Sequence, residues 1–238
     1  EPDVPPLFEE PPKTEAYRKF AAELEKRERA LRAYTGGKFA ELIRTSKTRA
    51  AEYMLAARSA QDRPNTEDFM LLADGNDLNP TMLLRWKVFL GRTRRRHDPV
   101  FAPWHALATL PDGEFAVRSR DLVLKWSRQP DPARPLNPLV VKALADNPPR
   151  SLAEAAQVYS RLLNAADAIG HEAAVRAALN GAEPGPLPVG PLEELRQAFR
   201  GPDAPPALAR SALNDLALLP HRPAQAEFQK LRDALESW

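Results

Sequence analysis

The residue types that could do chemistry are concentrated in one block, residues 78–111 (LNPTMLLRWKVFLGRTRRRHDPVFAPWHALATLP). The block holds two of the four tryptophans, two of the four histidines, and six basic residues that precede its only acid, Asp98. Histidines beside a carboxylate could bind a metal ion, clustered arginines could bind phosphate, and tryptophans could stack on sugars. Each of these hypotheses has a structural alternative.

His97, Asp98 and His105 are the residues of this block that could ligate a metal ion. A helix that begins at Pro99 would leave His97 outside its first turn and place His105 near its middle. The chain has no His-Glu-x-x-His spacing, and no third ligand stands out. Asp98 also has a structural role as the N-cap of that helix. We therefore predict no metal site.

The basic residues of the block, Arg92 and residues 94–96 preceded by Arg85 and Lys87, could contact phosphate. Arginines at the end of a helix are also favoured by the helix dipole, and they could pair with acidic residues elsewhere in the protein. The formal net charge is only +2, and the chain has no known nucleic-acid-binding motif. We predict that nucleic acid is not a partner.

Trp86, Trp104 and Trp126 fall on the apolar faces of three successive predicted helices. Their register with aliphatic neighbours favours a role in the core, but an aromatic cluster could also stack on a ligand. Core tryptophans should be less than about a fifth exposed, whereas a binding surface would expose Trp86 and Trp104 side by side. In that alternative, a glycan or peptide would be held by an aromatic and basic surface around residues 85–105, which comprises Trp86, Arg94, Arg95, Arg96, His97 and Trp104.

The chain lacks the motifs of the common catalytic sites. It has no Gly-x-Ser-x-Gly elbow, no glycine-rich phosphate loop and no convincing pair of carboxylates. It also has no cysteine, which excludes a cysteine nucleophile, a thiolate metal site and a covalently held haem within this segment. We predict no catalytic residues, no cofactor in this segment and no enzymatic activity.

The elements that must position these residues are predicted to be helices. The 25 prolines far outnumber the 10 glycines, and several follow a residue that can cap a helix, as in Asn79-Pro80, Asp98-Pro99 and Asn137-Pro138. Ser151 and Glu154 form a capping box before a strongly periodic helix. Alternating, β-branched runs are almost absent, so the predicted fold class is all-α. No run of about 18 apolar residues could span a membrane.

We predict three parts along the chain. Residues 1–12 are a proline-rich lead-in, residues 13–60 form a long antiparallel helical hairpin, and residues 61–238 form a compact helical body. The hairpin is predicted from two amphipathic stretches of about 22 residues, since Gly36-Gly37 separates them and glycine disfavours a helix interior. The opening at Glu1 without a Met, and the helical pattern up to Trp238, suggest a segment of a longer protein.

Three stretches carry a resemblance to a known family. They are Arg85-Trp86 followed by residues 97–104 (HDPVFAPW), the opening residues 1–6 (EPDVPP), and residues 200–206 (RGPDAPP). Together they resemble the middle region of large exported planctomycete proteins. In that family a domain with a c-type haem-like Cys-x-x-Cys-His motif precedes this region, and a domain of unknown function follows it.

The resemblance implies an exported or periplasmic location and, as partners, the flanking domains of the same polypeptide, including a haem-bearing one. Structural signals are abundant in the sequence, whereas catalytic signals are lacking. The function expected first is therefore a non-catalytic helical spacer and interaction module within a larger cytochrome-like multidomain protein. The alternative is the glycan- or peptide-binding module described above.

Overall fold

The computed structural model describes residues 14–59, 77–208 and 221–237. These residues form nine α-helices, one short 3₁₀ helix at Asp112–Glu114 and no strand, so the predicted all-α class is confirmed. The α-helices are α1 (Glu15–Thr48), α2 (Ala50–Ser59), α3 (Pro80–Arg96), α4 (Ala102–Leu107), α5 (Phe115–Arg128), α6 (Pro138–Asp146), α7 (Leu152–Leu179), α8 (Gly190–Arg200) and α9 (Arg222–Glu236). The predicted lead-in, residues 1–12, lies outside the described residues.

The helix starts predicted from capping residues are confirmed for α3, α6 and α7. The side chain of Asn79 accepts a hydrogen bond from the N–H of Met82, and Asn137 accepts from the first N–H groups of α6. Ser151 accepts from the N–H of Glu154, while the Glu154 carboxylate accepts from the N–H of Arg150, one residue before the cap. Each bond satisfies an amide that has no partner inside its helix, and proline at the first position of α3 and α6 removes another.

The predicted turn at Gly36-Gly37 is wrong. Helix α1 continues through both glycines for 34 residues, or about 50 Å, and the chain changes direction only at Arg49, before α2. A glycine in a helix interior costs about 1 kcal/mol, which long flanking runs of good helix-forming residues can offset. A Cβ atom on either glycine would meet no atom within 4 Å, so packing does not require a glycine there.

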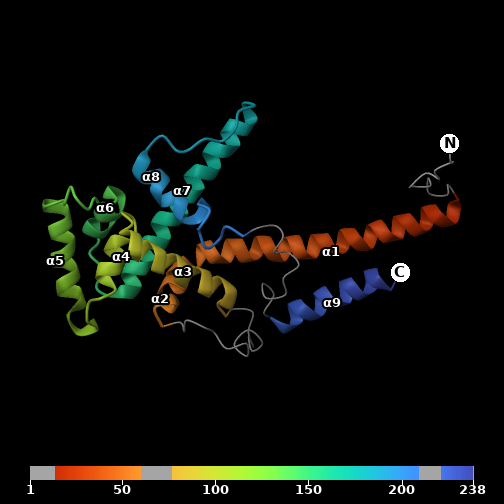
Figure 1. Cartoon of the computed structure of the whole chain (residues 1–238), viewed down its shortest axis with the longest axis horizontal. Coiled ribbons are helices and arrows are strands. Elements are labelled where there is room, and N and C mark those ends of the chain that lie inside the picture. Colours follow the sequence, from red (N-terminus) through yellow and green to blue (C-terminus); the bar gives the residue numbers. More distant parts are fainter. Residues whose placement is uncertain (1–13, 60–76, 209–220, 238) are drawn as a thin grey trace, which may run out of the picture.

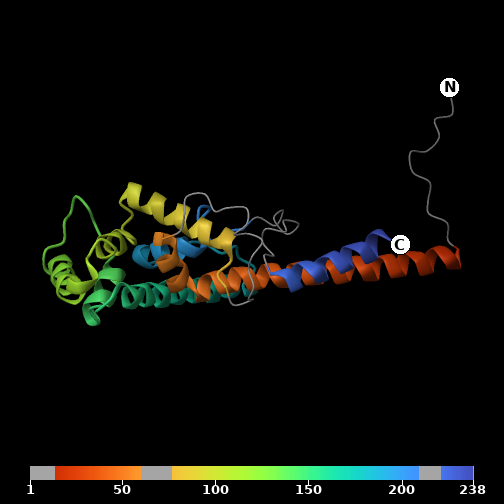
Figure 2. The same ribbon diagram turned by 90° about the horizontal axis from the view of Figure 1, so that it is seen from below.

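Helix α1 has a different antiparallel partner, the distant helix α9. Figure 2 shows α9 lying along α1, away from the other helices. Arg27 donates a hydrogen bond to the carbonyl of Ala234, and Tyr34 donates one of 2.9 Å to the carbonyl of Ala224. The long antiparallel pair therefore joins the two ends of the described chain, whereas the prediction confined it to residues 13–60.

The body of the molecule is built around α7. Helices α2, α4, α6 and α8 pack against α7, and α3 packs against α2 and α4 (Figure 1). Within this body a chain of ring contacts runs from Phe199 through Trp86, Phe89 and Phe101 to Tyr159. The C-terminal part of α1, where Leu42 and Ser46 are buried, connects the α1–α9 pair to the body.

Candidate functional site

Two of the residues predicted to bind a ligand lie in the core. Trp86 is 0% exposed and Trp104 is 1% exposed, which agrees with the burial expected of core tryptophans. Trp86 donates a hydrogen bond of 3.3 Å from its indole N–H to Ser46, and Trp104 packs edge-on against Tyr159 of α7. From its place on the helix that follows, Trp104 is expected to pack on Trp86 or Phe89 of the preceding helix. The described ring contacts connect it to Phe89 only through Tyr159 and Phe101.

Tyr159 holds this part of the core together through its hydroxyl group. The hydroxyl donates a 2.7 Å hydrogen bond to the carbonyl of Val100 and accepts one of 3.0 Å from the N–H of Trp104. Its burial raises the pKa of Tyr159 well above the usual value, so the phenol stays neutral. The two bonds attach the turn before α4 and α4 itself to α7.

His97 ends α3 in a backbone conformation that is uncommon for histidine. Its φ of 50° and ψ of 47° are left-handed, and it is the one non-glycine residue with a positive φ in the described part of the chain. The N–H of His97 bonds to the carbonyl of Arg94, and the N–H of Asp98 bonds to the carbonyl of Thr93. This is a Schellman ending, in which glycine is the usual residue because side chains in this conformation cost about 1–2 kcal/mol.

Asp98 caps the next turn as predicted. Its carboxylate accepts hydrogen bonds from the N–H of Val100 at 2.9 Å and from the N–H of Phe101 at 3.2 Å. The predicted helix start at Pro99 is wrong, because regular helix begins only at Ala102. Residues 98–101 form a capped turn instead, whose last residue, Phe101, is held in the core by Phe89 and Tyr159.

His105 has a structural partner and does not lie beside Asp98 in a metal site. Its Nε2 is 3.0 Å from the hydroxyl oxygen of Thr93, which donates its own proton to the carbonyl of Leu90, so Nε2 is the donor in this pair. Burial, with a smaller effect of Arg94, lowers the pKa of His105 from 6.5 to about 4. No group of three potential ligands positioned for a metal ion occurs among the residues described.

Three of the arginines, Arg85, Arg92 and Arg96, contact residues 203–207. Arg85 donates hydrogen bonds to the carbonyls of Ala204, Pro205 and Ala207 at 2.7–3.2 Å. Arg92 pairs with Asp203 at 2.6 Å, and Arg96 lies 3.7 Å from the same carboxylate. Arg85, which belongs to one stretch that carries the family resemblance, is therefore in direct contact with another of these stretches, residues 200–206. Arg94 and Arg95 are exposed at the end of α3.

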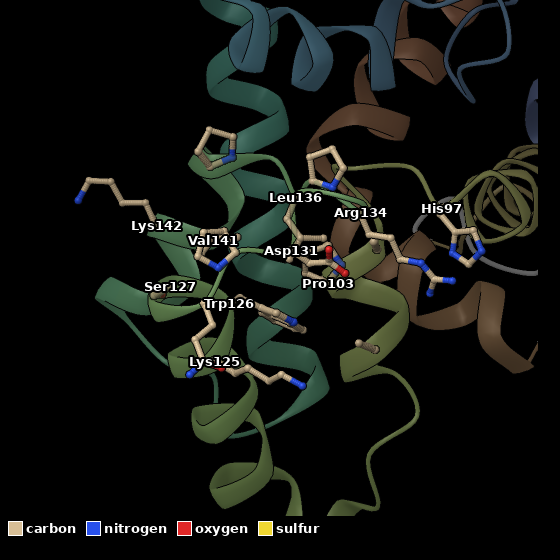
Figure 3. Close-up of a pocket in the computed structure, with 16 residues that line it drawn as sticks. His97, Pro103, Lys125, Trp126, Ser127, Asp131, Arg134, Leu136, Val141 and Lys142 are labelled. Atoms are coloured by element: carbon tan, nitrogen blue, oxygen red, sulfur yellow. The ribbon is translucent and has the colours of Figure 1, made fainter.

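An open pocket of about 590 Å³ lies beside this helix end, between α4, the end of α5 and the start of α6. Of the residues predicted to bind a ligand, His97 is the one that lines it (Figure 3). Trp126, Leu136 and Val141 form apolar walls, and Trp126 lies between Lys142 on one side and Arg134 and His97 on the other. The pocket therefore combines an aromatic wall with a basic rim.

The sequence pattern did not indicate this pocket, because the register of Trp126 with aliphatic neighbours favoured a place in the core. Trp126 is only half-buried, and Lys125 and Arg134, which also line the pocket, were not singled out. A usable signal was present in the segment Lys125–Pro135 (KWSRQPDPARP), where a tryptophan is followed by cations and by a proline-rich loop. Such a loop cannot continue the helix, so it folds back beside the tryptophan.

No family model, curated protein or solved structure matches this chain. Among the described helices, none has both the length and the hydropathy needed to cross a membrane.

Proposed function

We propose that this chain is a non-catalytic helical spacer and interaction module within a larger exported, cytochrome-like multidomain protein. It would set the geometry between a haem-bearing upstream domain and a downstream domain of unknown activity, as the family resemblance implies. The observation that carries the proposal is the α1–α9 pair, which extends well beyond the body (Figure 1). A 34-residue helix of this kind holds two groups about 50 Å apart.

The charged surface of α1 favours a rigid helix that remains folded in solvent. Exposed pairs of opposite charge, four residues apart, occur along its outer part as Glu15–Lys19, Glu25–Arg29 and Glu28–Arg32. Each such pair adds about 0.2–0.5 kcal/mol to helix stability. Arg27 and Tyr34 donate hydrogen bonds to the backbone of α9, which therefore packs along α1. The paired helices resist bending more than α1 alone would.

The roles of the chemically versatile residues also favour a structural function. Asp98 caps a turn, His105 bonds to Thr93, and Arg92 pairs with Asp203. The burial of Trp86 and Trp104 disfavours the alternative, in which a glycan or peptide binds around residues 85–105, because neither indole reaches the surface. Arg94, Arg95 and His97 would supply the polar part of such a surface without an aromatic platform.

Distance measurement between spin labels tests the spacer. The chain has no cysteine, so Glu15→Cys on α1 and Arg120→Cys on α5 introduce two unique labelling sites in the full chain. We expect one narrow distance distribution, both in this chain and in the longer protein that contains the flanking domains. Adding Gly36→Pro, which breaks a helix interior, should broaden it, whereas the matched Gly36→Ala should not. A broad distribution without the proline, or substrate turnover by the purified chain, would contradict the proposal.

A further inference from the structure

We propose that the pocket between α4, α5 and α6 binds a small organic anion with a flat apolar ring. The ring would stack on Trp126, and the acidic group would lie against Lys125 and Arg134. This inference is independent of the spacer function, because α4, α5 and α6, which contribute the lining of the pocket, lie in the body, away from the α1–α9 pair (Figure 1). Its volume of about 590 Å³ is within the usual range for small-molecule sites.

The apolar part of the pocket suits a flat ring. Trp126 is half-buried at the end of α5, with Pro103 of α4 and Val141 of α6 also lining the space. Tryptophan presents a broad, rigid aromatic face, and such faces bind rings with little loss of side-chain freedom. This is the aromatic platform that the buried Trp86 and Trp104 do not provide.

The charged part of the pocket favours an anion. Within the described residues, no hydrogen bond or ion pair involves the side chain of Lys125 or Arg134, whereas Lys142 is paired with Asp146 at 2.9 Å. The one carboxylate of the lining, Asp131, accepts a 2.9 Å hydrogen bond from the N–H of Ala133 and so shapes its own loop. The rim therefore presents two cations that no described residue neutralises by direct contact.

The walls of the pocket are held in place before a ligand binds. Asn137, which ends the loop of residues 129–136, is 1% exposed and donates its N–H to the carbonyl of Pro99. Its side chain caps α6 and donates to the carbonyl of Pro191 and to Glu194. A site that is fixed in advance loses less free energy on ordering when a ligand binds.

The strained His97 is a separate observation that points to the same pocket. Its left-handed backbone would suit glycine better, yet this position carries an imidazole, and that side chain lines the pocket. Strained residues tend to occur where a side chain is needed for binding or catalysis. We infer that the imidazole contributes a polar contact to the anion.

The probe for this site is 8-anilinonaphthalene-1-sulfonate, an anion with flat rings whose fluorescence rises on binding. N-phenyl-1-naphthylamine, which has the same rings without the sulfonate, is the neutral comparison. We expect one sulfonate probe per chain. In the Lys125→Gln/Arg134→Gln double variant its affinity should fall about tenfold, which corresponds to about 1.4 kcal/mol. The affinity of the neutral probe should stay within about twofold, since only the charge contact is lost.

Three further variants complete the test. Trp126→Leu should lower the affinity for both probes. Arg120→Gln, which changes an exposed cation of α5 outside the pocket, should lower the affinity for neither. His97→Gly should weaken the sulfonate probe while raising the melting temperature, since glycine relieves the backbone strain. The proposal is overturned if the double variant and Arg120→Gln bind the sulfonate probe equally. It is also overturned if the double variant weakens both probes to the same extent.

Discussion

Asp98 and Trp104 lie six residues apart but stabilise the fold by different physics. Asp98 supplies a carboxylate to two backbone N–H groups, and its loss should cost about 1 kcal/mol. Trp104 is buried against Tyr159, and truncation to alanine would leave a cavity that costs about 3–5 kcal/mol. Trp104 therefore contributes more to the free energy of unfolding than Asp98, because it fills a larger buried volume.

We predict that Trp104→Ala lowers the free energy of unfolding at least twice as much as Asp98→Ala. Urea unfolding of both variants, followed by circular dichroism, measures the difference. Metal addition to the wild-type protein serves as the control for a functional role of Asp98 and should leave the unfolding midpoint unchanged. The structural interpretation fails if Asp98→Ala abolishes metal or ligand binding while the unfolding midpoint stays the same.

The lowered pKa of His105 leads us to predict a loss of stability in mild acid. Burial lowers its pKa to about 4 from an ordinary value of 6.5, so the folded state favours the neutral imidazole. The contribution is present above pH 6.5 and is lost as the pH falls from about 6.5 towards 4, because the unfolded chain then binds the proton more strongly. His105→Gln, which can still donate to Thr93, should flatten the unfolding profile in this range.

Glu193 extends the acid sensitivity to lower pH. Its carboxylate accepts hydrogen bonds from Arg196, the largest effect, and from the N–H of Leu187, which together lower its pKa to about 2 from 4.5. Its contribution is present above pH 4.5 and is lost as the pH falls towards 2. Glu193→Gln should therefore lower the stability by a constant amount above about pH 4.5 and remove the pH dependence between about pH 4.5 and 2. For His105, an unfolding profile of His105→Gln that matched the wild type between pH 4 and 6.5 would contradict the role of this histidine in the acid sensitivity.

At the scale of elements, α1 shows how a helix can contain a pair of glycines. Gly36 and Gly37 lie in the open, where an added Cβ atom has no neighbour within 4 Å. Replacing both with alanine should therefore stabilise the protein by about 1 kcal/mol for each residue, because alanine is the better helix former. Thermal unfolding of Gly36→Ala/Gly37→Ala measures this gain.

The matched control at this position is Gly36→Pro, which should lower stability by about 3 kcal/mol through the loss of a hydrogen bond and a steric clash. The two substitutions have opposite expected signs only if the segment is helical. If the alanine variant were instead destabilised, the glycines would have to adopt a conformation that alanine disfavours, and the continuous α1 would be incorrect.

At the scale of the whole molecule, Asp167 of α7 links the long helix to the body. It accepts from Lys47 of α1 at 2.7 Å and from Arg200 of α8 at 2.6 Å. The Lys47 and Asp167 side chains are only 13% and 15% exposed, so solvent screens this pair weakly. Although burial raises the pKa of Asp167, the two cations outweigh it, and the net shift is downward.

We predict that Asp167→Asn lowers the free energy of unfolding by about 1–3 kcal/mol, because a partly buried lysine would lose its charge partner. The same substitution should broaden the distribution of spin-label distances between α1 and α5, since the link between the α1–α9 pair and the body weakens. The control is Glu172→Gln, five residues after Asp167 on α7. It removes the exposed ion pair between Glu172 and Arg176 and should change stability by less than about 0.5 kcal/mol. Equal effects of the two variants would exclude this role of Asp167.

The sequence by itself determined the features that depend on neighbours along the chain. The all-α class and the starts of α3, α6 and α7 follow from local periodicity and from capping residues such as Asn79, Asn137 and Ser151. The core positions of Trp86 and Trp104 also follow, since each falls in register with aliphatic residues on one helix face. Hydrogen bonds to a cap and the period of a helix involve residues at most four positions apart, so sequence patterns contain them.

Only the tertiary structure decided which surfaces meet. An apolar stripe on α1 requires a cover, but its periodicity does not say whether the cover is a neighbouring segment or α9, about 190 residues away. In the same way, the arginines of α3 require acceptors, and the structure supplies Asp203 and the carbonyls of the residues after it. Trp126 differs from Trp104 because its outer side meets a proline-rich loop that leaves a pocket. Packing of distant segments sets burial, and burial decides whether an aromatic residue fills a core or forms a site.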